Sequence, residues 1–248
     1  MITIGKNIIV KNEIESTNNY AKQMVSDKPE EGTVVLAHYQ FKGRGQQGNF
    51  WESEPGENLL FSIIFYPSFL DVAMQFYLSK AVSFALFEYI SDVVADVKIK
   101  WPNDIYVGNK KIAGILIENA VKGNHLDYSI VGIGLNLNQN KFYSEAPNPV
   151  SLAQLTGIEF NKEEQLKKLL KAIEKWYSIL QNQQLKEIDS AYLKNLYAFK
   201  QWRKYRVGTK ELTGWIKGVG EFGQLQLEFR SGVIKEFMFK EIELVIED

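Results

Sequence analysis

Residues 39–51 read YQFKGRGQQGNFW, a stretch that contains three glycines, one arginine and four side-chain amides. The apolar runs on either side of it, 34–36 (VVL) and 59–65 (LLFSIIF), are typical of buried strands. No helical periodicity fits between them, so the glycines are predicted to lie on a loop between two core strands. Glycines free backbone N–H groups to bind an anion, and an arginine can hold a carboxylate or phosphate through two hydrogen bonds. The loop is therefore a candidate anion-binding site.

The length of 248 residues and the composition, 45% hydrophobic and 24% charged, are typical of an ordinary globular protein. The 29 lysines and arginines nearly balance the 30 aspartates and glutamates, so no net charge attracts nucleic acid or anionic lipid. The chain has no cysteine and two histidines, so we expect no disulfide, no thiolate nucleophile and no zinc site. Neither a signal-peptide pattern nor a long apolar span is present, which favours a cytoplasmic protein.

Apolar residues that recur at three- and four-residue steps predict helices, and short apolar or alternating runs predict strands. The predicted helices are 17–25, 71–93, 151–157, 162–180 and 185–197. The predicted strands are 8–10, 34–36, 59–65, 98–101, 105–107, 111–118 and 129–137. Short alternating runs with glycine turns follow Trp202 and predict a small β-barrel appended to an α/β domain. We place the two domains at 1–200 and 201–248.

The polar cluster Ser16-Thr17-Asn18 precedes the first predicted helix. Ser16 or Thr17 is a natural N-cap, which explains the cluster without any ligand. Two hydroxyls and an amide at a helix N-terminus could equally bind a small polar ligand. The glycines at 132 and 134 lie inside a predicted strand, where glycine often marks close approach by a ligand or another backbone.

Gly43, Gly45 and Gly48 match the GxGxxG spacing of dinucleotide-binding folds, but no helix is predicted to follow them. The downstream strands form a meander and do not alternate with helices, so this assignment fails. No GK[ST] phosphate loop and no Ser-His-Asp or Cys-His arrangement is visible either. The candidate site therefore has no covalent nucleophile.

The remaining candidates for functional residues are Arg44 on the glycine loop, several side-chain amides, and Lys111 on a hairpin near Asp104. Two cations could neutralise a carboxylate and an α-phosphate during an in-line displacement. Asn103 or Asp104 could hold a magnesium ion or accept a proton from an incoming amine. The alternatives are that WPND (101–104) is only a turn between strands, and that Lys111 is a solvated lysine beside its neighbour.

Four motifs together resemble the biotin protein ligases, in the same order and over nearly the whole chain. They are Ser16-Thr17-Asn18, then Tyr39-Gln40 with GRGQQGNFW (43–51), KWPNDIYVGNKKIAGILIE (100–118) and IVGIGLNLN (130–138). The resemblance implies a mixed β-sheet catalytic domain backed by helices, with a small SH3-like C-terminal β-barrel. It implies a two-step reaction in which biotin and ATP give biotinyl-5′-AMP, and a lysine of a biotin carboxyl carrier protein then attacks this anhydride.

The resemblance also implies roles for particular residues. The implied biotin-binding residues are Ser16, Thr17, Asn18, Gln40, Arg44, Lys111, Gly114 and Gly134. The implied ATP or adenylate residues are Gly45, Gln46, Asn49, Trp51, Asn103 and Asn136. The implied catalytic residues are Lys111, Arg44 and Asp104, with Asp104 also the candidate Mg²⁺ ligand. We expect ATP with Mg²⁺ and biotin as substrates, and neither zinc, haem nor flavin.

Two features depart from the usual family pattern. Many members have arginines where this chain has Gln46 and Asn49, and an amide can donate to phosphate but adds no positive charge. We hypothesise that the protein either holds its adenylate less tightly or recruits another cation to the loop. The biotin motif also begins only sixteen residues into the chain, which predicts a monofunctional ligase without an N-terminal DNA-binding domain.

Two other functions compete with this interpretation. A lipoate or octanoate ligase or transferase has a similar fold but binds a more apolar acid, whereas the Ser-Thr-Asn cluster and Gln40 suit a ureido ring. A nucleic-acid-binding module could use the barrel with Lys200, Arg203, Lys204 and Arg206, but the balanced net charge argues against it. We expect no DNA or membrane partner, and a monomer or weak homodimer.

Overall fold

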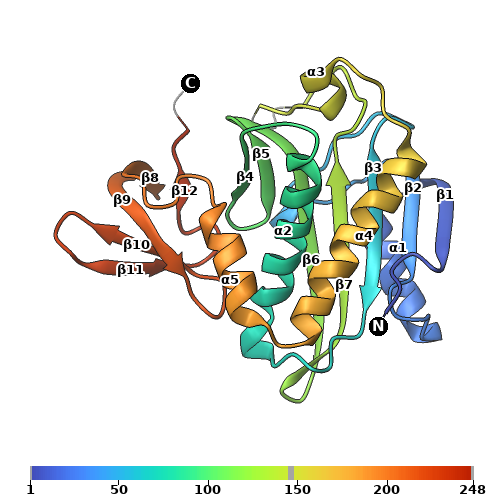
Figure 1. Cartoon of the computed structure of the whole chain (residues 1–248), viewed down its shortest axis with the longest axis horizontal. Helices are drawn as coiled ribbons and strands as arrows, with labels where there is room; N and C mark the ends of the chain where they lie inside the picture. Colours follow the sequence, from blue (N-terminus) through green and yellow to red (C-terminus); the bar gives the residue numbers. More distant parts are fainter. Residues whose placement is uncertain (1, 145–147, 247–248) are drawn as a thin grey trace.

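The computed structural model describes residues 2–144 and 148–246, which form two β-sheets with five α-helices between and around them (Figure 1). The larger sheet has seven strands. In spatial order they are β1 (Ile8–Ile14), β2 (Val34–Gln40), β3 (Leu59–Phe65), β7 (His125–Leu135), β6 (Lys110–Lys122), β5 (Asp104–Val107) and β4 (Val97–Lys100). The β1–β2 pair is parallel and the other pairs are antiparallel, so the sheet is mixed, as predicted.

The smaller sheet is antiparallel and contains the C-terminal strands. They are β11 (Ile234–Phe237), β10 (Leu225–Phe229), β9 (Lys210–Val219), β8 (Arg203–Val207) and β12 (Glu243–Leu244). This second sheet confirms the predicted small β-rich C-terminal region. The domain boundary after residue 200 stays a prediction, because the last helix ends at Lys194 and the next strand begins at Arg203.

Strand β3 lies near the centre of the large sheet, and all seven of its residues are buried. Successive side chains point to opposite faces of a strand. Phe61, Ile63 and Phe65 accordingly belong to the main core, whereas Ile64 packs in a small second cluster on the other face. Ser62 shares that second face, which also carries the candidate site.

Helices α2 (Phe76–Ser91) and α4 (Lys162–Gln181) cross one face of the sheet, with α5 (Leu185–Lys194) beside them (Figure 1). The apolar stripe of α4 is buried in the main core, as its periodicity predicted. The short helix α3 (Leu152–Thr156) begins at a Ser151–Gln154 capping box and ends at Gly157 in the left-handed conformation. Helices α2, α4 and α5 do not cover the opposite face of the sheet, where the described residues form only a small apolar cluster.

Helix α1 (Thr17–Met24) is the helix that packs on that opposite face, through Ala21 against Val35, Ile64 and Ile130. The small size of this cluster leaves room for a hollow beside the helix. Several predicted boundaries were wrong: the helix expected from residue 71 begins at Phe76, after a separate 3₁₀ turn, and the helix expected to reach residue 197 ends at Lys194. In residues 2–144 and 148–246, no helix combines the length and apolar character needed to cross a membrane.

Candidate functional site

A cavity of about 380 Å³ opens on the face of the large sheet away from α2 and α4, between the glycine loop and the C-terminal sheet. Of the fifteen residues predicted for the site, all but Asn136 line it. These are Ser16, Thr17, Asn18, Gln40, Arg44, Gly45, Gln46, Asn49, Trp51, Asn103, Asp104, Lys111, Gly114 and Gly134. Segments that are far apart in the sequence thus meet in one cavity. Their individual roles stay predictions.

One end of the cavity is a buried polar cluster around the N-terminus of α1. Gln40 Oε1 accepts a hydrogen bond from the backbone N–H of Thr17 at 2.6 Å. Ser62 Oγ lies 2.7 Å from both Thr17 Oγ1 and Asn18 Oδ1. Ser16 is the N-cap by position, but its side chain makes no capping hydrogen bond in the described structure. The simple capping explanation therefore does not account for this cluster.

Ser62 is a polar member of the cluster that the sequence interpretation missed. It is fully buried, and its hydroxyl contacts two of the predicted biotin residues. A buried hydroxyl needs a hydrogen-bond partner. A lone serine inside the apolar run LLFSIIF was therefore the available signal that this strand faces something polar.

Gly132 lets α1 approach the sheet. A Cβ placed on Gly132 would overlap the carboxamide of Asn18. The amide nitrogen of Asn18 donates to Leu116 O at 3.2 Å and to Glu118 Oε2 at 2.8 Å. Glycine at this position is therefore required by contact with the Asn18 side chain, whereas the sequence suggested approach by a ligand or another backbone.

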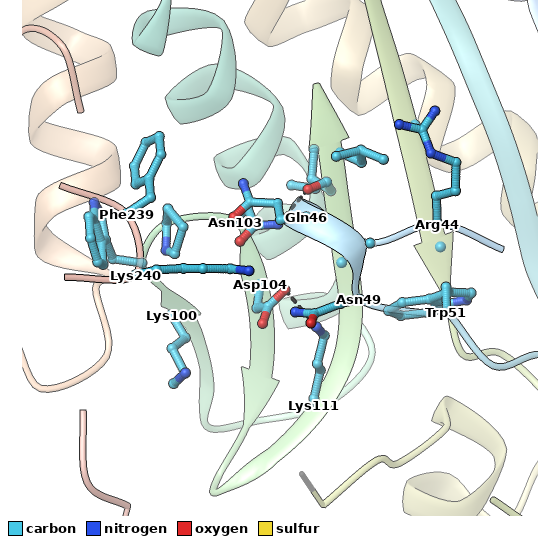
Figure 2. Close-up of a pocket in the computed structure, with 18 of the residues that line it drawn as sticks. Arg44, Gln46, Asn49, Trp51, Lys100, Asn103, Asp104, Lys111, Phe239 and Lys240 are labelled. Atoms are coloured by element: carbon cyan, nitrogen blue, oxygen red, sulfur yellow. Dashed lines mark hydrogen bonds and ion pairs between the residues drawn. The ribbon is translucent and has the colours of Figure 1, made fainter. Parts of the chain in front are cut away.

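The Arg44 side chain makes its hydrogen bonds at the same end of the cavity as the polar cluster. Its guanidinium donates to both carboxylate oxygens of Glu118, at 3.1 and 3.0 Å, and to Asn19 Oδ1 at 2.6 Å. Figure 2 shows the guanidinium directed away from Lys111 and Asp104. Glu118 compensates the charge of Arg44 in this structure, a partner that the sequence did not reveal.

Lys111 and Asp104 form the second centre of the cavity, with Nζ 2.8 Å from Oδ1. Both side chains are largely buried, at 22% and 18% exposed, so their interaction is stronger than an ion pair in open solvent. The main chain of Lys111 is fixed independently, because its N–H donates to Asn148 O and its carbonyl accepts from Val150 N–H, both at 2.9 Å. The hypothesis that Lys111 is an ordinary solvated lysine does not fit this arrangement.

Trp51 lies over the glycines between these two centres. A Cβ on Gly114 would come within 2.8 Å of the indole, and one on Gly134 would overlap it. The two glycines therefore allow the indole to lie directly against the backbone of the sheet. The indole nitrogen of Trp51 is buried without a hydrogen-bond partner among the described residues. This N–H group lies next to the cavity and could donate to a bound ligand.

The C-terminal sheet supplies the remaining wall. Trp101 Nε1 donates to Gly223 O at 2.8 Å, and its ring packs on Phe239 with centroids 5.4 Å apart. The next residue, Lys240, extends toward Asn103 and Asp104 (Figure 2). No prediction from the sequence placed this region in the site.

Lys100 also lines the cavity. Burial is the main cause that lowers its pKa, although the nearby Asp104 carboxylate acts in the opposite direction. A lysine in such surroundings is a candidate for binding an anion, because a nearby negative charge favours its protonated form.

Asn136 lies just behind the cavity wall and is buried. Its side-chain amide donates to Val150 O at 3.1 Å, and its backbone N–H donates to Ile112 O at 2.9 Å. These bonds connect the end of β7 to the segment that also holds the Lys111 backbone. In this structure the residue supports the wall.

A polar cluster, a lysine–aspartate pair, the glycine loop and the C-terminal sheet border one cavity, an arrangement that suits a ligase that activates a carboxylate. The model of the biotin/lipoate A/B protein ligase family matches residues 10–136, which include all fifteen predicted site residues. The chain belongs to this family.

Two relatives and one solved structure illustrate the similarity. The chain is 31% identical over 248 residues to the bifunctional ligase/repressor BirA of Bacillus subtilis, covering 97% of this chain and 75% of that protein. It is 31% identical over 205 residues to the biotin–[acetyl-CoA-carboxylase] ligase of Paracoccus denitrificans, covering 80% and 85%. The biotin protein ligase of Aquifex aeolicus in complex with biotin and ATP superposes with a TM-score of 0.79 and 29% identity, over 98% of this chain and all of that one.

Proposed function

We propose that this protein is an ATP-dependent biotin–protein ligase. It would join biotin and ATP into biotinyl-5′-AMP and transfer the biotinyl group to a lysine of a biotin carboxyl carrier protein. The observation that carries the proposal is one cavity with a buried polar cluster at one end and the Lys111–Asp104 pair at the other. The cluster suits a small polar ring, and the ion pair suits a carboxylate that reacts with a phosphate.

In the first step an oxygen of the biotin carboxylate attacks the α-phosphorus of ATP, and the bond to the bridging oxygen of pyrophosphate breaks. Ser16, Thr17, Asn18 and Gln40 bind the ring, while the backbone at Gly114 and Gly134 lines its path. Glu118 compensates the charge of Arg44, whereas Lys111 would face the reacting groups from beside Asp104. The role of Lys111 is to stabilise the charge that develops on the α-phosphate.

In the second step the amine of an acceptor lysine attacks the acyl carbon, and AMP leaves with the former carboxylate oxygen. The amine must lose a proton, and the Asp104 carboxylate would accept it. Asp104 also fits a magnesium ion that arrives with the nucleotide, since Mg²⁺ in such sites takes one or two carboxylates together with phosphate oxygens. When bound, the ion would supply further positive charge to the phosphates.

A pyrophosphate-exchange assay tests the proposed function. The purified protein should catalyse exchange of labelled pyrophosphate into ATP with biotin but not with lipoate or octanoate. With ATP and biotin it should label an added carrier protein at a lysine. Exchange stimulated by lipoate alone would instead support the lipoate assignment, which the polar character of the Ser62–Thr17–Asn18 cluster disfavours.

The amide at Gln46 leads to a prediction about retention of the adenylate. Gln46 lines the cavity, and replacing it with arginine adds a cation that can bind phosphate through two hydrogen bonds. We expect Gln46→Arg to slow dissociation of biotinyl-5′-AMP about tenfold, measured by chase of the labelled adenylate. Gln23→Arg, on the exposed side of α1, is the matched control. An unchanged dissociation rate in Gln46→Arg would show that the adenylate is already held tightly.

We further propose a cytoplasmic enzyme that works as a monomer or weak homodimer. Light scattering with and without biotin and ATP measures the oligomeric state. A stable higher oligomer in both conditions would contradict this assignment.

A further inference from the structure

We propose that Lys240, from the C-terminal sheet, contacts the β- and γ-phosphates of ATP and so replaces the positive charge that the glycine loop lacks. This inference rests on the proposed ligase function and adds a residue to it. Lys240 follows β11 and lines the same cavity as Asp104 and Lys111, although it lies far from both in the sequence.

The distribution of charge in the cavity is the first observation. At the polar-cluster end, Glu118 neutralises Arg44, which is the only cationic residue between Gly43 and Trp51. At the other end, the cavity is lined by three lysines and two carboxylates. They are Lys100, Lys111, Lys240, Asp104 and Glu243. Three of the four cationic side chains that line the cavity thus lie at this end, where a polyphosphate would meet them beside the C-terminal sheet.

The second argument is the direction in which pyrophosphate would leave in the proposed reaction. In an in-line displacement the attacking and leaving oxygens lie on opposite sides of the phosphorus. Biotin would enter from the polar cluster, so pyrophosphate would leave past Lys111 and Asp104 toward the C-terminal sheet. Lys240 extends into this region from the far wall (Figure 2). A lysine there meets the distal phosphates and not the α-phosphate.

The backbone at Lys240 is the third observation. Its φ is +68°, in the left-handed region that is unfavourable for residues other than glycine. The neighbouring Phe239 packs against Trp101 and Phe76, with centroids 5.4 and 5.9 Å apart, and so fixes this turn against the larger sheet. Lys240 thus has a backbone conformation that glycine adopts more easily, and its side chain is directed into the cavity (Figure 2).

The test compares Lys240→Gln, Lys240→Gly and Lys240→Arg with Lys235→Gln, an exposed lysine of β11 outside the cavity. We expect the glutamine and glycine variants to raise KM for ATP about tenfold or more and to weaken inhibition by pyrophosphate by a similar factor. Transfer from supplied biotinyl-5′-AMP should not change, because the adenylate has no distal phosphates. Lys240→Arg should restore most of the ATP affinity.

The glycine variant separates phosphate binding from folding. Glycine adopts a positive φ without strain, so the melting temperature of Lys240→Gly should not fall although its KM for ATP rises. A KM for ATP in Lys240→Gln within twofold of Lys235→Gln would overturn the assignment, as would faster loss of biotinyl-5′-AMP with unchanged ATP affinity. A wild-type protein without biotin-dependent pyrophosphate exchange would overturn the proposed function as well, which distinguishes the two failures.

Discussion

Replacing Lys111 with glutamine is expected to slow formation of biotinyl-5′-AMP by about a thousandfold, the upper range for loss of one preorganised charge-stabilising group. Lys111 Nζ lies 2.8 Å from Asp104 Oδ1 in the cavity. The substitution removes the cation and also leaves the Asp104 carboxylate uncompensated beside the incoming phosphates. Both changes disfavour the negatively charged transition state.

Single-turnover measurement of adenylate formation tests this expectation. Lys110→Gln is the matched control, because Lys110 is the exposed neighbour on the same strand and does not line the cavity. The backbone bonds of Lys111 to Asn148 and Val150 do not involve its side chain, so the variant should fold normally. A variant that keeps more than about a tenth of the wild-type rate would contradict the assigned role.

Replacing Gly132 with alanine is expected to weaken biotin binding about a hundredfold. The new Cβ would overlap the carboxamide of Asn18, which makes hydrogen bonds to Ser62, Leu116 and Glu118. Gly132 is paired with β3 on one side and β6 on the other, so its backbone cannot shift away from the new Cβ contact. Asn18 must therefore move. Loss of two or three buried hydrogen bonds, each contributing about 1 kcal/mol, corresponds to this factor.

Calorimetric titration with biotin measures the effect, with the melting temperature recorded in parallel. Gly218→Ala is the control, since this glycine lies in a strand of the smaller sheet and its Cβ would meet only the end of the Gln226 side chain, at 3.1 Å. If the overlap with Asn18 is the cause, the double variant Gly132→Ala with Asn18→Ala should bind biotin no more weakly than Asn18→Ala alone. Additive losses would place the cause elsewhere.

Local patterns were sufficient to predict most of the elements. The bounds of β3 were predicted without error from its apolar run, and the capping residues of α3 are Ser151 and Gly157, as expected. The start of α2 was wrong because residues 72–74 form a separate 3₁₀ turn, which has nearly the same apolar spacing as a first helical turn.

The site could be predicted where its residues lie within short motifs, and could not where it depends on tertiary packing. Ser62, Glu118 and Lys240 all take part in the cavity or its hydrogen bonds, yet no role was predicted for any of them, although Glu118 ends one of the four motifs. Their role arises because antiparallel pairing brings β3, β7 and β6 together and because the C-terminal sheet docks on Trp101. Such contacts follow from the register of the sheet and not from local spacing.

The docking of Trp101 on Gly223 and Phe239 also limits how this chain can be recombined with its relatives. The cavity wall crosses the junction between the two sheets, so an exchanged C-terminal segment brings its own residue at position 240 into the cavity. A chimera that joins the first two hundred residues to a foreign C-terminal segment would thus inherit a different nucleotide affinity along with its new surface. In this protein the smaller sheet is therefore part of the cavity wall and not an interchangeable module.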